Sequence, residues 1–339
     1  MRRASLVAAI AACASALALP TGASALTSSQ IFGIGDQATL PEPLEGEPAF
    51  ADIFADPRLK ALKPKATRYI ADYKVAQTPS RDRERLDAWY QLGLKYKLRM
   101  LIAFTDFGKK TPPDMNKYRR GLVAFHKRYP AIKEWAPINE ANHSTQSTYR
   151  RPQVAVRMVK VARSVCSSCT LVQLTLVLGF ESDIRYARDF MDLLPKSERK
   201  RMIWGLHTYS DTNRNSSKHL TAFLKRLPTG GVWFTESAAW AQFAPPTWPY
   251  SLTRQANRTA LVFRQALAAS KRVKRLYWYE WDGDTNRDAR WDSGLVDGNG
   301  KVRPAYKVAL AERFRTKLTA FQKRQMGLSV VSQIASHKP

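Results

Sequence analysis

The chain is predicted to fold as a single (β/α)8 barrel, and three observations lead to this prediction. Short apolar runs alternate with longer segments whose apolar residues recur at helical spacing. The length of 339 residues suits one such barrel. No internal repeat, linker or change in composition marks a second domain. A doubly wound open sheet is the alternative, but no G-x-G-x-x-G motif follows the first apolar run.

The expected strands are short and rich in aliphatic and aromatic residues. In chain order they are Ile31–Gly35, Ala66–Ile70, Arg99–Phe104, Glu134–Ile138, Leu171–Leu178, Ile203–Thr208, Val232–Thr235 and Leu276–Trp281. The expected helices between them show one apolar face each, as in Leu86–Leu94, Ala155–Ala162 and Ala256–Leu267. The long first connection, Pro41–Leu62, is expected to carry a short helix. These eight strands with intervening helices match the alternation of a parallel barrel.

The N-terminus has the features of a secretory signal. Met1-Arg2-Arg3 is a positive start, Ala4–Leu19 is apolar, and Ala23-Ser24-Ala25 fits signal peptidase cleavage after Ala25. We therefore expect residues 1–25 to be removed and the protein to be secreted or associated with the cell envelope. Cys13 ends a loose lipoprotein box, but the apolar run continues past it, which disfavours lipidation.

The mature chain is expected to comprise a catalytic domain, residues 26–320, and a basic, then apolar tail, residues 321–339. After the signal, no apolar run is long enough to cross a bilayer. Cys166 and Cys169 remain, and in an exported chain this spacing favours a small structural disulfide over redox or metal chemistry.

The chain is strongly basic, with 55 Lys and Arg against 28 Asp and Glu and a net charge of +27. Such a field favours polyanions. The basic residues are spread along the whole chain and no nucleic-acid motif appears, so nucleic acid is not the expected partner. A solvated basic surface and association with anionic cell-surface polymers both remain open.

Two glutamates end apolar runs, Glu140 in Trp135-Ala136-Pro137-Ile138-Asn139-Glu140 and Glu236 in Val232-Trp233-Phe234-Thr235-Glu236. Glutamate is depleted in strands and costly to bury, so this placement suggests a function. In a parallel barrel the active site lies at the C-terminal ends of the strands, where both residues are expected. Two carboxyl groups, one protonated and one ionised, are what glycoside hydrolysis needs.

Other acids compete for these roles less well. Glu134 begins its strand, at the end of the barrel away from the chemistry, and is expected to be structural. Glu280 precedes Trp281 by one residue and should point to the opposite side of the strand. Asp106 follows the third strand, where a turn or helix-cap role is favoured over sugar binding.

The order of these residues resembles that of the clan A retaining glycoside hydrolases, from about Ile31 to Ala309. Asn139-Glu140 after the fourth strand and Glu236 after the seventh match the clan's catalytic pair. His207-Thr208-Tyr209 is similar to its H-x-Y element, and Arg68 to its arginine near the nucleophile. The remaining marks are an aromatic residue ending the last strand, Trp281, and the closing segments Trp291–Asp297 and Arg303–Tyr306.

The resemblance implies a role for each matching residue. Glu140 would be the general acid and later the base, and Glu236 the nucleophile. Asn139 would bind the substrate 2-hydroxyl, while Arg68 and Tyr209 would hold Glu236 ionised and oriented. His207 would line the sugar subsite. Trp281 would stack on one face of a pyranose ring. As the donor, Glu140 is expected to have a raised pKa.

The sequence thus predicts an exported, monomeric O-glycosyl hydrolase that cleaves a poly- or oligosaccharide with retention. No metal and no organic cofactor are expected, because no His/Asp/Glu cluster has ligand spacing. The alternative is a non-catalytic barrel that binds carbohydrate or the cell envelope. The sugar, its linkage and endo or exo action stay open, since loops rather than the fold decide them.

Overall fold

The computed structural model describes residues 26–27, 29–35, 51–269 and 271–314. The predicted signal peptide, residues 1–25, and the predicted tail, residues 321–339, lie outside the described residues. Among the described residues, no helix is both long and apolar enough to span a membrane. The expected disulfide joins Cys166 to Cys169.

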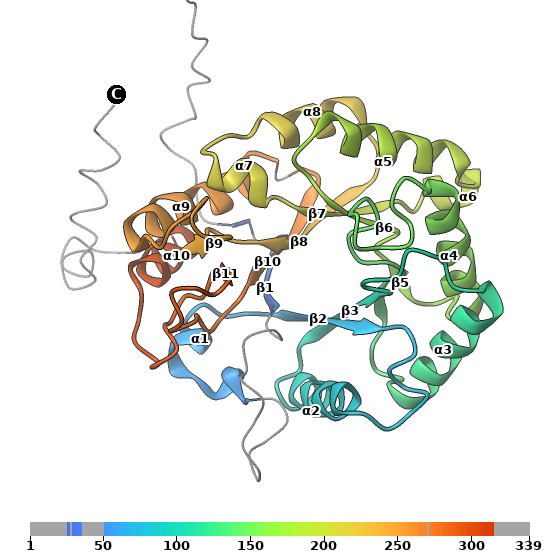
Figure 1. Ribbon diagram of the computed structural model, residues 1–339, viewed down its shortest axis with the longest axis horizontal. Helices are drawn as coiled ribbons and strands as arrows, with labels where there is room; N and C mark the ends of the chain where they lie inside the picture. Colours follow the sequence, from blue (N-terminus) through green and yellow to red (C-terminus); the bar gives the residue numbers. More distant parts are fainter. Residues whose placement is uncertain (1–25, 28, 36–50, 270, 315–339) are drawn as a thin grey trace, which may run out of the picture.

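Parallel strands form one curved sheet at the centre of the molecule (Figure 1). They are β1 (Ile31–Gly35), β2 (Ala66–Asp72), β3 (Arg99–Thr105), β4 (Glu134–Ala136), β5 (Thr170–Leu171), β6 (Leu174–Val177), β7 (Ile203–His207), β8 (Gly231–Ser237) and β10 (Val273–Tyr279). Their order is β5-β4-β3-β2-β1-β10-β8-β7-β6, so β5 and β6 stand at the two ends.

The two ends of this order are one interrupted strand. Only Val172 and Gln173 separate β5 from β6. The Val172 amide donates to Trp135 O of β4 at 2.8 Å, and the Gln173 amide donates to Ile203 O of β7 at 3.1 Å. Backbone hydrogen bonds therefore run from β4 through this segment to β7 and close the ring. The predicted (β/α)8 barrel is confirmed.

Helices surround the strands (Figure 1). They are α1 (Pro57–Ala61), α2 (Arg81–Lys95), α3 (Met115–Arg128), α4 (Pro152–Val165), α5 (Glu181–Leu193), α6 (Lys196–Arg199), α7 (Tyr209–Asn213), α8 (Lys218–Arg226), α9 (Leu252–Ala268) and α10 (Pro304–Arg313). Side-chain caps start several of them, as where Ser80 accepts from the Arg83 amide. The helix expected in the first connection is present as α1, preceded by a 3-10 turn at Ile53–Ala55.

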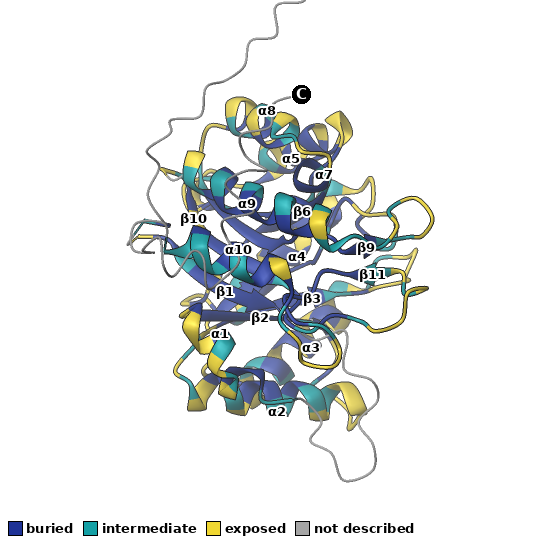
Figure 2. Cartoon of the chain, turned by 90° about the vertical axis from the view of Figure 1, so that its left-hand side faces the viewer, coloured by how far each residue is buried: buried dark blue, intermediate teal, exposed yellow. Residues whose placement is uncertain are grey.

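The core has two layers, one inside the barrel and one between strands and helices, and the strands are largely buried (Figure 2). Small and large side chains alternate inside the barrel. Those in the interior cluster are Ala66, Leu101, Ala103, Ala136, Val172, Trp233 and Tyr277. Gly33 is required there, because a Cβ at that position would lie 2.6 Å from the Tyr277 ring.

The last barrel strand differs from its predicted bounds of Leu276–Trp281. It begins at Val273 and ends at Tyr279. The sequence pattern did not indicate its start because Lys274 and Arg275 interrupt the apolar run. Its end comes early because the following segment pairs elsewhere, with the Leu295 amide donating to Trp281 O at 2.8 Å.

A small antiparallel sheet lies in the loops at the C-terminal end of the barrel. It pairs β9 (Gln242–Phe243), from the loop after β8, with β11 (Trp291–Asp292), from the loop after β10. The register places Trp291 opposite Phe243. The loop after β8 and the loop after β10 are therefore joined through this small sheet.

Candidate active site

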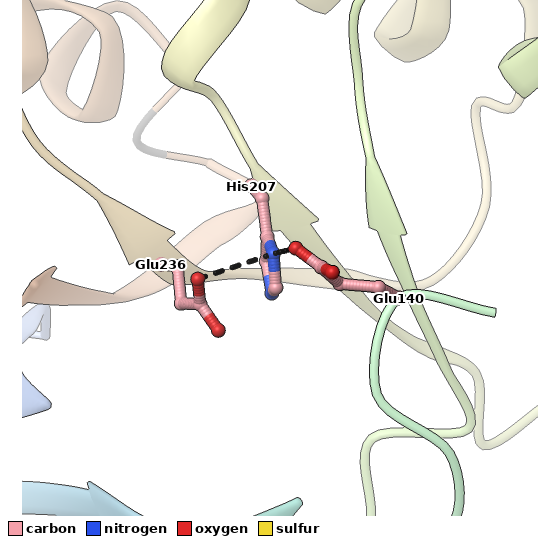
Figure 3. Close-up of side chains that lie close together, drawn as sticks. All are labelled: Glu140, His207 and Glu236. Carbon is pink, nitrogen blue, oxygen red and sulfur yellow. Dashed lines mark hydrogen bonds and ion pairs between the residues drawn. The ribbon is translucent and has the colours of Figure 1, made fainter. Parts of the chain in front are cut away.

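Glu140 and Glu236 face each other at the C-terminal end of the barrel (Figure 3). Glu140 lies beyond the end of β4, and Glu236 is the penultimate residue of β8. One oxygen of each carboxylate and a ring nitrogen of His207 all lie within 4.8 Å of one another. Retaining glycosidases hold their carboxyl groups about 5–5.5 Å apart and inverting ones roughly 6.5–9.5 Å. The observed separation is closer to the retaining than to the inverting arrangement and fits direct attack by one carboxylate.

Two donors hold the Glu236 carboxylate. Arg68 Nη1 donates to Glu236 Oε1 at 2.6 Å, and Tyr209 OH donates to Glu236 Oε2 at 2.9 Å. The side chains of Arg68 and Glu236 are only 1% and 7% exposed, so their charges attract through a poorly screened environment. Burial and then the charge of Glu236 raise the pKa of Tyr209 well above its ordinary value, so this hydroxyl keeps its proton and donates. The two contacts orient the Glu236 carboxylate within the site.

Arg68 also connects Glu236 to Asn139. Its Nη2 donates to Asn139 Oδ1 at 2.7 Å, and the Asn139 amide donates to Phe104 O of β3 at 2.6 Å. The guanidinium of a residue on β2 therefore positions side chains from β4 and β8 with one rigid fork. Since Asn139 Oδ1 accepts from Arg68 and the backbone amide donates to Phe104 O, the side-chain Nδ2 is the donor that Asn139 could offer to a ligand.

His207, at the end of β7, lies between the two glutamates. Its Nδ1 is 3.0 Å from Glu140 Oε1 and 3.5 Å from Glu236 Oε2 (Figure 3). The imidazole is fully buried, whereas the Glu140 side chain is 22% exposed. The shorter distance makes Glu140 the main partner of His207. A carboxylate pair this close would repel strongly without a shared donor between them.

The backbone at Glu140 adopts a strained conformation. Its φ of 46° lies in the left-handed region, which is rare for residues other than glycine. The Glu140 amide donates to Thr175 Oγ1 at 2.8 Å, and Thr175 in turn donates to Ile138 O at 2.8 Å. Thr175 is a functional-site residue that the sequence prediction missed. The signal was a hydroxyl inside the apolar run Leu174–Val177.

The expectation of a raised pKa for Glu140 is wrong. Burial is the largest influence and raises the pKa, but the hydrogen bond from His207 and the charges of His207, His143 and Arg68 together outweigh it. The net result is a pKa below the ordinary value for glutamate. A raised pKa was expected because the first step needs a protonated donor. The sequence could not show that His207 lies beside Glu140 and lowers its pKa.

Trp281 does not lie where a sugar could stack on it. Its side chain is 1% exposed, and its ring packs edge-on against Tyr306 of α10 with centroids 6.0 Å apart. The cause is the early end of β10, after which Trp281 joins the closing segment. Two half-buried aromatic rings lie nearer the site. The Trp291 ring is edge-on to Tyr209 with centroids 4.7 Å apart, and the Tyr279 ring lies 6.0 Å from Trp291.

Two further residues have structural positions. The Trp240 ring stacks between Tyr209 at 5.9 Å and Phe243 at 4.3 Å and is 5% exposed, so it packs the loop after β8. Asp106 accepts from the Ser147 amide at 3.2 Å and from the Ser147 hydroxyl, so its side chain joins two separate loops rather than capping its own turn or helix.

Among the described residues, one group has the donor atoms to hold a metal ion, and it is the same trio of Glu140, His207 and Glu236. The surroundings disfavour a cation there. Both oxygens of Glu236 already accept from Arg68 and Tyr209, and the guanidinium would lie next to the ion. The geometry suits an electrophilic sugar carbon better than a metal.

No model of a known protein family matches the sequence, and no curated protein matches it. Solved structures do resemble it. A family 39 glycoside hydrolase from the gut symbiont Bacteroides cellulosilyticus WH2 superposes with a TM-score of 0.60 at 12% identity, over 84% of this chain and 64% of that one. This chain therefore spans less than two thirds of that enzyme.

Two others have similar scores. A family 10 endoxylanase from a sugarcane soil metagenome has a TM-score of 0.60 at 13% identity, covering 85% of this chain and 98% of that one. A monomeric β-xylosidase from Caulobacter crescentus CB15 has a TM-score of 0.56 at 14% identity, over 85% and 68%. These structures, which are named as glycoside hydrolases or xylan-degrading enzymes, share the barrel fold of this chain.

Proposed function

We propose that the protein is a retaining O-glycosyl hydrolase in which Glu236 is the nucleophile and Glu140 is the general acid and base. The observation that carries the proposal is the pair of carboxylates brought together within 4.8 Å, with only Glu236 held by a guanidinium and a phenol. Because Arg68 and Tyr209 donate to Glu236 and not to Glu140, Glu236 is the carboxylate suited to attack the sugar, and Glu140 is left to act as the acid and base.

The reaction would proceed in two displacements. A Glu236 oxygen forms a bond to the anomeric carbon while the bond to the leaving oxygen breaks, and Glu140 gives that oxygen its proton. Water then adds to the same carbon, its proton passes to Glu140, and the Glu236 carboxylate is released. Asn139 would donate its amide hydrogen to the 2-hydroxyl during both steps, held in place by Arg68.

A panel of activated 2-deoxy-2-fluoro glycosides tests the proposal. Xylosides and glucuronides belong in the panel because solved neighbours are named as a β-xylosidase and a β-glucuronidase. The expected result is a covalent adduct, found by mass spectrometry on the peptide that contains Glu236, and its loss in Glu236→Gln. Glycan binding without an adduct and without hydrolysis of a broad polysaccharide panel would instead indicate a non-catalytic carbohydrate-binding barrel.

We also propose export with cleavage after Ala25 and action as a monomer. The test is N-terminal sequencing of the protein from its natural host, together with its mass in solution. A mature chain that begins at Leu26 and sediments as a single copy is expected, whereas retention of Met1 in the mature protein would contradict export by cleavage.

Activity should be greatest on the acidic side of neutrality. The lowered pKa of Glu140 leaves little of its protonated form at neutral pH, and the first step needs that form. His207→Gln removes the leading group that lowers this pKa, while burial continues to raise it. The alkaline limb of the kcat/KM profile should therefore move to higher pH.

His126→Gln is the matched control for this change. His126 lies on α3 outside the barrel, against the Trp135 ring with centroids 5.5 Å apart, and should leave the alkaline limb in place. A His207→Gln profile whose alkaline limb stays still or moves to lower pH would contradict the role assigned to His207.

A further inference from the structure

Where the structure describes them, the loops at the N-terminal end of the barrel contain no exposed carboxylate. These loops lead into the strands and lie opposite the end that carries Glu140 and Glu236. Among the described residues, the loops into β2, β3, β4, β5, β8 and β10 contain no Asp or Glu. The loop into β7 contains Glu198, which is buried and lies 3.2 Å from Arg163.

The same end is rich in exposed cations. Exposed lysines and arginines in these loops and at the strand starts are Lys63, Lys65, Lys97, Arg99, Lys133, Lys200, Arg201, Lys271 and Lys274. Within the part of the chain that the structure describes, Arg99 is the one of these with a carboxylate in ion-pair range, Glu134 at 3.9 Å. Their charge is therefore available to an external anion.

The opposite end of the barrel is different. The segment that follows β10 alone carries Glu280, Asp282, Asp284, Asp288, Asp292 and Asp297. Among the described residues, several carboxylates near the N-terminal end are paired with cations, as Asp52 is with Lys95, Glu134 with Arg275 and Glu198 with Arg163, so the unpaired charge there is mainly positive. The distribution gives the barrel a positive N-terminal end and a mixed catalytic end, and the field of such a face attracts polyanions.

A cavity of about 230 Å³ opens on the positive end, between the segments that lead into β2 and β3. Its lining contains no carboxylate. Apolar side chains and Tyr96 form part of the wall, and three lysines complete it; the lining residues are Phe54, Leu59, Lys60, Lys63, Pro64, Lys65, Tyr96 and Leu98. A sugar ring can pack its C–H groups on such a wall while an acidic substituent meets the ammonium groups.

We propose that the N-terminal end of the barrel docks the protein on an anionic polysaccharide that carries repeating carboxylates, with this cavity holding one acidic sugar unit. The choice of a glycan rests on the proposed function. Docking at this end leaves the catalytic mouth, at the other end, free to reach chains in the same matrix. A membrane surface fits less well, because of the large exposed hydrophobic residues in the described structure only Leu94 and Leu193, in the last turns of α2 and α5, come near these loops.

Affinity electrophoresis of the full chain in polygalacturonate tests the proposal, with dextran as the neutral polymer. The triple variant Lys60→Gln/Lys65→Gln/Lys133→Gln should bind polygalacturonate about tenfold more weakly than the parent. The control Lys109→Gln/Lys110→Gln/Lys117→Gln removes the same charge from exposed lysines near the catalytic end and should lose about twofold or less. Lys271→Gln/Lys274→Gln provides a second variant should the first fail to fold by circular dichroism.

Equal losses in the two triple variants would overturn the proposal, because net charge alone would then explain binding. Tighter binding of a DNA duplex or of vesicles containing an anionic phospholipid, lost in the same variant, would also overturn it. Labelling of Glu236 is scored separately. A labelled enzyme that ignores polygalacturonate contradicts only the docking surface, whereas docking without labelling contradicts the glycosidase and supports the surface.

Discussion

Glu236→Gln is expected to lower kcat on an activated aryl glycoside by on the order of 10⁵-fold. The substitution keeps the size and the hydrogen-bonding shape of the side chain, but an amide cannot form the glycosyl-enzyme bond. Arg68 and Tyr209 lie 2.6 and 2.9 Å from the two carboxylate oxygens; in the variant Arg68 can still donate to the amide oxygen, while the amide nitrogen would donate to the Tyr209 oxygen. The loss would therefore report chemistry rather than folding.

Glu140→Gln provides a comparison within the same site. A good leaving group needs no proton, so this variant should still accumulate the covalent intermediate, and azide should restore turnover because it needs no base. Glu280→Gln tests the rival carboxylate. Loss of the adduct in Glu280→Gln while Glu236→Gln keeps it would contradict the assignment of the nucleophile.

Glu134→Gln is expected to destabilise the protein by about 3–5 kcal/mol, the usual cost of removing one partner of a buried ion pair. Arg275 Nη2 donates to Glu134 Oε1 at 2.5 Å, and Arg275 Nη1 contacts the other carboxylate oxygen. The Arg275 guanidinium also lies 3.7 Å from the centroid of the Trp233 ring and is 5% exposed. Without the carboxylate, this cation would stay buried in the barrel interior with no countercharge.

Glu84→Gln is the matched control, because Glu84 pairs with Arg81 at 2.9 Å on an exposed helix surface. Its cost should be below about 1 kcal/mol. Urea unfolding of both variants measures the difference. Equal midpoints for Glu134→Gln and Glu84→Gln would contradict a structural role for the buried pair.

The positions of both glutamates could be predicted because they depend on local rules. Apolar runs identified the strands, and a parallel barrel places the C-terminal ends of its strands at one face. Glu140 and Glu236 follow such runs directly. Arg68, His207 and Tyr209 also end up beside them, although only the resemblance to a known clan, and not the residue pattern alone, pointed to these three.

Trp281 shows where a local rule fails. A position just beyond the last strand was expected to face the site, yet the backbone at Trp281 turns to pair with Leu295 and the ring packs against Tyr306. These partners come from the closing segment, and no periodicity in the sequence indicates which way that segment folds back.

The sequence by itself determined the barrel and the end of it at which two carboxylates meet, because strand periodicity and the end of a strand are local properties. The tertiary structure alone decided that His207 joins Glu140 at 3.0 Å and lowers its pKa. It also decided that positive charge gathers at the end opposite the site. Both depend on register and side-chain direction among residues far apart in the chain, and these are settled only when the sheet closes.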